Sequence, residues 1–161
     1  MSECGLRQAV EDVLTELSMS AGDRFVLKGK GAVVGYWCCD ELRRVNENLV
    51  LNAVKYGDSD SPITIDFQTR LDCILLSVHN RGFTLSLEEQ ENLFKPFSRT
   101  ISAPASGQRG WGLGLTLVRG VCESHGGSVS VRSLPKKGTT FIVQLPRDSR
   151  WVAETPPGSA S

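Results

Sequence analysis

The sequence carries no net charge, because its 161 residues include 18 lysines and arginines and 18 aspartates and glutamates. Proteins that bind nucleic acid or membrane surfaces electrostatically carry a basic excess, so we expect neither kind of partner for this chain. It has no apolar run of membrane-spanning length and no charged-then-apolar leader after Met1. These absences predict a soluble, cytoplasmic domain, which a longer parent protein can still tether to a membrane.

Cysteine and histidine patterns typical of metal sites are also missing. The five cysteines are an odd number and show no metal-ligand spacing, so we expect buried, reduced thiols. The sequence has no internal repeat, and its length favours one domain with a core of its own. We assign that domain to residues 1–147, and the polar stretch at 148–161 predicts a disordered tail.

Apolar spacing and turn residues predict an α+β fold. Helices are expected from the start of the chain to about residue 19, at 41–56 with Asp40 as N-cap, at 86–93, and between the glycines at 110–114 and those at 126–127. Strands are expected at 24–28 and 33–38, joined by a turn at 29–31, and at 63–67, 73–78, 128–133 and 139–145. This order favours a two-layer α/β sandwich with a mixed, mostly antiparallel sheet and helices on one face.

The stretch at 110–115, Gly-Trp-Gly-Leu-Gly-Leu, alternates glycine with apolar residues and leads into the last helix. A loop at a helix start exposes unpaired backbone N–H groups and the positive end of the helix dipole. Where no Cβ intervenes, a phosphate can approach this backbone closely. Alternating glycines also occur in bulged strands and in hinges, so the stretch alone does not establish a phosphate site.

The helix at 41–56 carries a polar stripe beside its core-facing side. Asn48, Asn52, Lys55 and Tyr56 fall within an arc of roughly 100°. A buried amide without a partner costs on the order of 1–3 kcal/mol, so either neighbouring backbone groups or a ligand must satisfy it. Amide oxygens suit Mg²⁺, a lysine suits phosphate, and a tyrosine suits stacking on a base. We favour the ligand.

Three other segments are ambiguous when each is taken singly. Residues 78–82 are either an ordinary strand exit or present the Asn80 amide to the edge of a purine. Residues 94–97, Phe-Lys-Pro-Phe, anchor a mobile loop at 98–108 that is placed to act as a lid. Thr139 is either a β-forming residue or reaches a base through a water.

Together and in this order, these segments resemble the catalytic and ATP-binding domain of sensor histidine kinases, from the superfamily that includes the ATPase domains of gyrase, MutL-type mismatch-repair proteins and a heat-shock chaperone. The resemblance covers about Leu6 to Pro146. It implies a Bergerat-type ATP-binding fold that holds Mg-ATP between the asparagine helix and the lid. The matching segments are the N box at 47–56, the first glycine box at 80–82, the F box at 94–97, the second glycine box at 110–115, and the ending at 126–127 and 138–141.

The resemblance also implies roles for single residues. Asn52 and Asn48 would hold Mg²⁺, while Asn52 and Lys55 would be the catalytic residues. Tyr56 would flank the adenine, and Gly82 would let the base approach the backbone. The nucleotide site as a whole is assigned to Asn48, Asn52, Lys55, Tyr56, Asn80, Gly82, Leu85, Phe97, Arg109, Gly110, Gly112, Leu113, Gly114, Leu115 and Thr139.

Two positions depart from the family pattern. Asn80 stands where an aspartate usually accepts a hydrogen bond from the adenine amino group, and Thr84 stands where a second glycine is common. The Asn80 oxygen can still accept, but its amide nitrogen can also donate. The sequence therefore leaves both base preference and affinity for ATP open.

The implied reaction is phosphoryl transfer from ATP to a histidine on a separate dimerisation domain, with a response regulator downstream. Neither His79 nor His125 lies on a helix with the acceptor pattern. The ATPase relatives carry a glutamate where Asn48 stands, and an amide cannot take a proton from water, so a protein histidine kinase domain is favoured over a hydrolase. The alternative is a degenerate module that docks on or regulates another kinase, with little or no nucleotide turnover.

Overall fold

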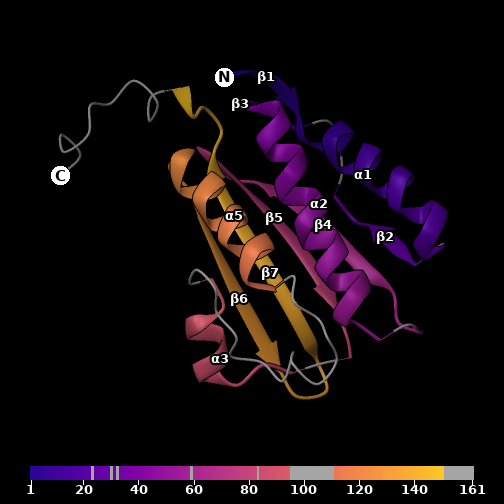
Figure 1. The fold of residues 1–161 in the computed structure, drawn as a ribbon. Coiled ribbons are helices and arrows are strands. Elements are labelled where there is room, and N and C mark those ends of the chain that lie inside the picture. The colour runs from indigo at the N-terminus through magenta and orange to yellow at the C-terminus, as the bar shows by residue number, and fades with distance from the viewer. Residues whose placement is uncertain are drawn as a thin grey trace.

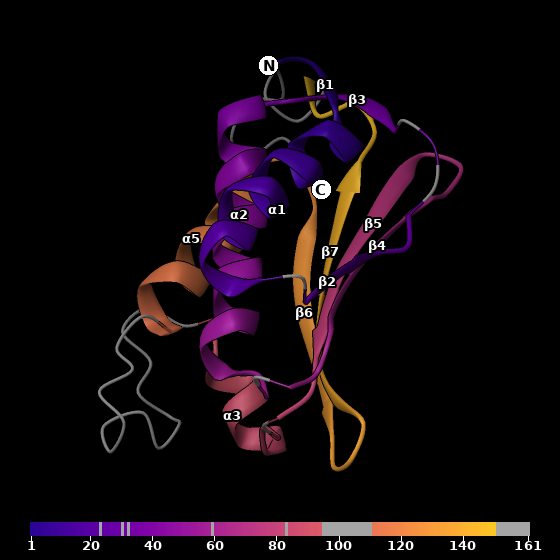
Figure 2. The ribbon, with the colours of Figure 1, turned by 90° about the vertical axis from the view of Figure 1, so that its right-hand side faces the viewer.

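The computed structural model describes residues 1–22, 24–29, 31, 33–58, 60–82, 84–94 and 111–150. Helices cover one face of a sheet in two layers, which the side view shows edge-on (Figures 1 and 2). The elements in chain order are β1 (Ser2–Gly5), α1 (Leu6–Ala21), β2 (Phe25–Leu27), β3 (Val34–Trp37), α2 (Cys39–Tyr56), β4 (Ile63–Thr69), β5 (Cys73–Asn80), α3 (Leu87–Asn92), α5 (Trp111–Ser124), β6 (Ser128–Leu134) and β7 (Gly138–Pro146).

The main sheet has five strands in the order β2-β4-β5-β7-β6. β2 runs parallel to β4, and the other neighbouring strands are antiparallel. This arrangement confirms the predicted two-layer α+β sandwich with a mixed, mostly antiparallel sheet. Among the described residues, none of the helices is both long enough and apolar enough to cross a bilayer.

The core lies between the helices and the sheet. Alternate residues of the central strands point into it, as the period-2 pattern of a half-buried strand requires; in β5 these are Ile74, Leu76 and Val78. The opposite set of β5 side chains is only half-buried, on the sheet face that the helices do not cover. An inward-facing side chain at the end of a strand therefore points toward the helix layer.

Helix α2 forms because its apolar residues recur at helical spacing. Its N-cap is Cys38, which makes no side-chain cap bond, so the predicted Asp40 cap is wrong. Asp40 and Glu41 lie in the first turn instead, where carboxylates interact favourably with the helix dipole. The Gly57 N–H closes the helix by donating to the Ala53 carbonyl at 2.9 Å. The buried apolar residues of α2 are Leu42, Val45, Leu49, Val50 and Ala53.

The two strands predicted at 24–28 and 33–38 exist, but they do not pair with each other. β2 joins the main sheet beside β4, while β3 pairs with β1 in a separate two-stranded sheet. A short turn between two strands favours a hairpin, and that local signal is overridden because β2 lines up with Ile63–Thr69 far along the chain. β1 itself, Ser-Glu-Cys-Gly, carries no alternating pattern, and the prediction that the first helix includes the start of the chain is wrong for these residues.

A disulfide joins Cys4 in β1 to Cys39 at the start of α2, with the Cα atoms 5.9 Å apart. The expectation of reduced thiols is therefore wrong for this pair, whereas Cys38, Cys73 and Cys122 are free. The two residues are separated by 35 positions in sequence. They meet because β1 pairs with β3, and β3 leads directly into α2.

Residues 147–150 pack beside β3 after β7 ends. The Tyr36 N–H donates to the Arg147 carbonyl at 2.8 Å, and the Ser149 N–H donates back to the Tyr36 carbonyl at 3.0 Å. Ser149 is fully buried. Three residues that the sequence assigns to the tail are thus part of the packed structure, and residues 151–161 lie outside the described part of the chain.

Candidate functional site

Two asparagines of the predicted stripe lie on α2, one turn apart. Asn52 is 6% exposed, and its Nδ2 has no hydrogen-bond partner. Asn48 is half-buried, and its Nδ2 donates to the Arg44 carbonyl at 2.7 Å. The backbone thus holds the amide nitrogen of Asn48, while Asn52 keeps an unpaired buried donor, which costs about 1–3 kcal/mol unless a ligand group meets it.

Asn48 touches the first turn of α5. A Cβ atom on Gly114 would lie 2.8 Å from Asn48 Oδ1, so the Asn48 side chain would have to shift to make room for any larger residue. Both ribbon views show α2 and α5 side by side (Figures 1 and 2). The asparagine stripe therefore faces the helix start that carries the second glycine box.

That helix start differs from the prediction. α5 begins at Trp111, so Gly112 and Gly114 belong to its first turn rather than to a loop before it. Glycine permits both loop and helical backbone angles, although it is a weak helix former, so the local pattern does not fix the first helical residue. Leu115 is fully buried in the core.

Replacing Gly114 with alanine is expected to lower affinity for Mg-ATP about tenfold, because the new methyl group must displace the Asn48 amide. The free energy of unfolding should change little, since better helix propensity offsets the crowding. Calorimetric titration and urea unfolding measure the two quantities. Gly120, in the same helix with nothing within 4 Å of its added Cβ, is the matched control. Gly120→Ala should stabilise the domain by about 0.5–1 kcal/mol and leave affinity unchanged; equal affinities for the two variants would contradict the assigned contact.

Asn80 is the last residue of β5, and its side chain points toward the helix layer beside the end of α2. Asn80 is 1% exposed, and its Nδ2 donates to the Arg81 carbonyl at 3.3 Å. A carbonyl oxygen only accepts, so the amide nitrogen must face it. A Cβ on Gly57 would lie 2.9 Å from the same nitrogen. The buried Oδ1, which has no partner, is therefore the atom of Asn80 that is left to recognise another group.

Gly82 lies directly against the end of α2. Its φ of 122° falls in a region that residues with a Cβ rarely adopt. A Cβ there would overlap the backbone nitrogen of Asp58, whose N–H donates to the Arg81 carbonyl at 2.5 Å. The first glycine box and the end of the asparagine helix are thus joined backbone to backbone.

The other predicted site residues differ in how the structure holds them. Leu85 and Thr139 are buried, and Thr139 is the cross-strand partner of Asn80. Tyr56 packs half-buried against the core, and Lys55 is exposed in the last turn of α2. Phe97, Arg109 and Gly110 lie outside the described residues, and for Gly112 and Leu113 only the helical backbone is described.

The two histidines lie away from this site. His125 is buried; its Nδ1–H donates to the Val121 carbonyl at 2.8 Å, and its Nε2 accepts from the Cys38 N–H at 3.0 Å. It therefore caps the end of α5, as the sequence predicts, and ties it to the start of α2. His79 precedes Asn80 in β5 and so points to the opposite face of the sheet, where its Nδ1 lies 2.7 Å from Thr140 Oγ1.

The pKa of His79 is lowered from its ordinary value, first by burial and then by the positive charges of Arg81 and Lys28. The unfolded chain then binds the proton more readily, so the contribution of His79 to stability decreases as the pH falls through 6.5. NMR titration of its ring protons should give a pKa below 6.5, and Arg81→Gln should raise it partway. A wild-type pKa at or above the ordinary value would contradict this assignment.

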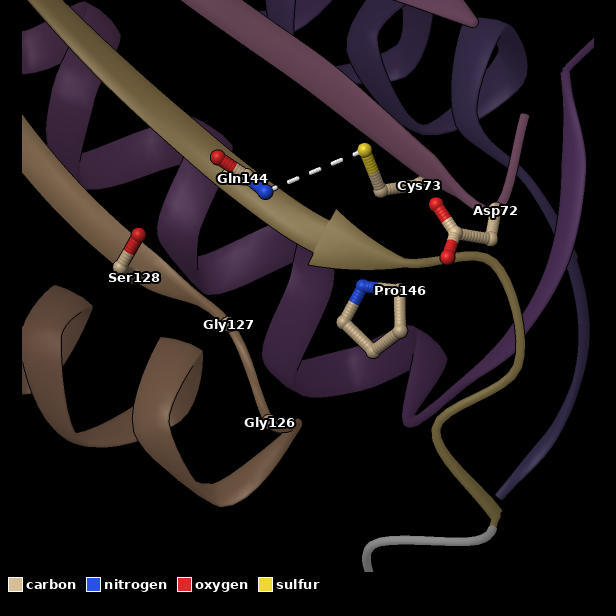
Figure 3. Close-up of a pocket in the computed structure, with 7 residues that line it drawn as sticks. All are labelled: Asp72, Cys73, Gly126, Gly127, Ser128, Gln144 and Pro146. Carbon is tan, nitrogen blue, oxygen red and sulfur yellow. Dashed lines mark hydrogen bonds between the residues drawn. The ribbon is translucent and has the colours of Figure 1, made fainter. Parts of the chain in front are cut away.

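A cavity of about 320 Å³ opens at the other end of the sheet (Figure 3). Its lining residues include Asp72 of the β4–β5 turn, Cys73 at the start of β5, Ser128 of β6 and Gln144 of β7. Gln144 Nε2 approaches Cys73 Sγ at 3.9 Å. Because β5 runs from Cys73 to Asn80, this cavity lies a full strand length from the site described above.

Comparison with known proteins gives consistent matches. Residues 39–149 match the family described as histidine kinase-, DNA gyrase B- and HSP90-like ATPase. Sensor protein IrlS of Burkholderia pseudomallei is 33% identical over 132 residues, which cover 81% of this chain and 28% of that protein. Sensor-like histidine kinase SenX3 of Mycolicibacterium smegmatis is 34% identical over 99 residues, which cover 62% of this chain and 26% of that protein. The chain thus spans less than a third of the length of these relatives.

Solved structures share the fold. The catalytic domain of histidine kinase ThkA, in a nucleotide-free form, has a TM-score of 0.80 at 23% identity, covering 92% of this chain and 97% of that one. The mycobacterial sensor histidine kinase MprB has a TM-score of 0.75 at 22% identity, covering 90% of this chain and 96% of that one. The two-layer architecture is therefore that of histidine kinase catalytic domains.

Proposed function

The chain belongs to the histidine kinase-, DNA gyrase B- and HSP90-like ATPase family, and from this premise we propose that it is the ATP-binding catalytic domain of a sensor histidine kinase. The observation that carries the proposal is the contact of Asn48 with Gly114, which sets the asparagine stripe of α2 against the start of α5. The unpaired oxygen of Asn80 lies at the end of the same helix. One helix thus joins a phosphate-binding end to a base-binding end.

The residues present fit a magnesium ion. Mg²⁺ takes oxygen ligands and keeps several waters, completing its shell with phosphate oxygens. We assign its protein ligands to the amide oxygens of Asn52 and Asn48. The Nδ2 of Asn48 is held by the Arg44 carbonyl, which leaves its oxygen for the ion. The unpaired Nδ2 of Asn52 is a donor, so it would meet a phosphate oxygen beside the ion and thereby remove the cost of its burial. When bound, the ion neutralises charge that develops on the phosphates.

The rest of the site divides between the two ends of the nucleotide. Lys55 and the backbone of the α5 first turn would hold the phosphates, where the helix dipole favours negative charge. The assignment of the phosphate end includes Gly110, Gly112, Leu113, Gly114 and Leu115, with Arg109 from the lid. The base end comprises Tyr56, Asn80, Gly82, Leu85, Phe97 and Thr139.

Transfer of the γ-phosphoryl group to a histidine suits this site better than hydrolysis. The bond between the γ-phosphorus and the bridging oxygen breaks, ADP leaves, and a new bond forms to an imidazole nitrogen of the acceptor. Asn48 stands where a general base would be needed for hydrolysis, and an amide cannot serve as one. His125 has both ring nitrogens engaged, and His79 lies on the opposite sheet face. The acceptor is therefore assigned to a dimerisation domain of the same or another kinase, with a response regulator downstream.

The test is incubation with γ-labelled ATP, Mg²⁺ and a candidate dimerisation domain. The expected product is a phosphorylated dimerisation domain whose label is lost in acid and kept in base, as for phosphohistidine. The Asn52→Ala variant is the control, and it should transfer no label.

A degenerate docking module remains the competing function, motivated by Asn80 and Thr84. The buried, unpaired Oδ1 of Asn80 favours nucleotide binding instead, because it presents an acceptor of the kind that an adenine amino group needs. Calorimetry with Mg-ATP and Mg-GTP separates the two functions. Absence of binding to either nucleotide would favour the docking module.

A further inference from the structure

A serine in β6 connects the base end of the site to the strand at the edge of the sheet. The alternation Val129, Val131, Ser133 puts Ser133 on the inward-facing side of the strand, where its neighbours are apolar. It is 6% exposed. A hydroxyl buried at such a position requires partners.

Ser133 has two such partners, and both belong to segments assigned to the nucleotide. Its Oγ accepts a hydrogen bond from the Leu85 N–H at 2.8 Å and lies 2.8 Å from Thr139 Oγ1. The Leu85 carbonyl accepts from Gln90 Nε2 at 3.0 Å, so both backbone groups of Leu85 are held. The loop that follows the first glycine box is thereby fastened to β6.

The strand register sets three polar side chains in one row. Asn80 on β5 is the cross-strand partner of Thr139 on β7, and Thr139 is the partner of Ser133 on β6. Directly opposed residues in antiparallel strands have Cβ atoms about 4.5–5.5 Å apart. All three side chains are buried on the helix-covered face. The row ends at the unpaired Asn80 Oδ1.

We propose that Ser133 is a positioning residue for purine recognition, an inference that rests on the proposed function. Its single hydroxyl fixes the Thr139 hydroxyl on one side and the Leu85 backbone on the other, without touching the base. Removing the hydroxyl takes the acceptor from the buried Leu85 N–H and takes one hydrogen-bond partner from the Thr139 hydroxyl. The Mg²⁺ and phosphate contacts lie on α2 and α5 and do not depend on it.

The test compares Ser133→Thr with Ser133→Val, which add nearly the same volume and differ by the hydroxyl. Calorimetry measures affinity for Mg-ATP, Mg-GTP and inorganic Mg-tripolyphosphate. Ser133→Val should lower affinity for Mg-ATP about tenfold and narrow the ratio of ATP to GTP affinity, with tripolyphosphate affinity unchanged. Ser133→Thr should stay within about threefold of the wild type for all three ligands. Ser133→Ala, which adds no volume, should repeat the valine result and serves if the larger side chains disturb folding.

The outcomes separate three cases. Equal loss for Mg-ATP, Mg-GTP and Mg-tripolyphosphate would show a merely structural serine and overturn the inference. Wild-type affinity and selectivity in both Ser133→Val and Ser133→Ala would also overturn it, while the proposed function would stand. Failure of the wild-type chain to bind any of the three ligands would refute the proposed function, and this inference with it.

Discussion

Replacing Asn52 with alanine is expected to lower affinity for Mg-ATP by at least about 100-fold. Loss of a residue that only hydrogen-bonds to a metal ligand already lowers metal affinity about 10–100-fold. The expected loss is larger for Asn52 because it is assigned as a ligand itself. Calorimetric titration with Mg-ATP measures the effect. Asn52→Asp, which keeps an oxygen ligand of the kind that Mg²⁺ prefers, should recover part of the affinity.

The fold should survive this substitution. Asn52 Nδ2 is buried without a partner, so its removal takes away an unsatisfied donor, and alanine is the better helix former. The free energy of unfolding, measured by urea denaturation, should stay the same or rise. A protein that lost both affinity and stability would indicate a structural asparagine instead.

Asn46 offers a matched control on the same helix. It is 2% exposed, and its Nδ2 also lacks a partner. It precedes Asn52 by six positions, which places it about 120° around the helix, away from the stripe. Asn46→Ala should leave affinity for Mg-ATP within about twofold of the wild type. Equal affinities for Asn46→Ala and Asn52→Ala would refute the assigned metal site.

The asparagine helix was predictable because two local signals agree along it. Apolar residues such as Val45, Leu49 and Ala53 recur at helical spacing and are buried, and the polar stripe lies at the margin of that pattern. Alternation with a period of two residues likewise predicts the strands at 63–67 and 139–145. Where burial and local preference point the same way, the sequence is sufficient.

Long-range pairing was not predictable from local signals. β2 and β3 look like a hairpin, yet each pairs with a distant strand. The Cys4–Cys39 disulfide depends on that pairing, so the cysteine pattern alone does not reveal it. In each case the deciding contact joins residues far apart along the chain, so the local sequence pattern does not indicate which residues pair.

Supporting residues of the site were missed for the same reason. The sequence predicts Ser133 to be an ordinary strand residue. Its position on the inward-facing side of an apolar strand nevertheless indicates that its hydroxyl needs hydrogen-bond partners. The sequence predicts Gly57 to be a turn residue with no further role, yet a Cβ there would crowd the Asn80 amide. The motifs locate residues assigned to touch the nucleotide, and only the packing reveals the residues that hold them.

Replacing Gly82 with alanine is expected to lower the free energy of unfolding by about 3–5 kcal/mol. Its positive φ of 122° strains any residue with a Cβ, at about 1–3 kcal/mol. The Cβ would also overlap the Asp58 backbone nitrogen, and forced overlap in a packed site adds about 1–3 kcal/mol. The backbone of Asp58, unlike a flexible side chain, cannot shift away from the new Cβ without displacing the end of α2.

Gly22 separates the two costs. It has a φ of 78°, and an added Cβ there meets nothing within 4 Å, so Gly22→Ala carries the strain without the overlap. Urea unfolding should show a loss of about 1–2 kcal/mol for Gly22→Ala, clearly less than for Gly82→Ala. At low denaturant, where Gly82→Ala remains folded, it should bind Mg-ATP more weakly than the wild type but bind Mg-tripolyphosphate equally well. Similar unfolding losses for both variants would mean that the contact of Gly82 with Asp58 does not hold the base end of the site against α2.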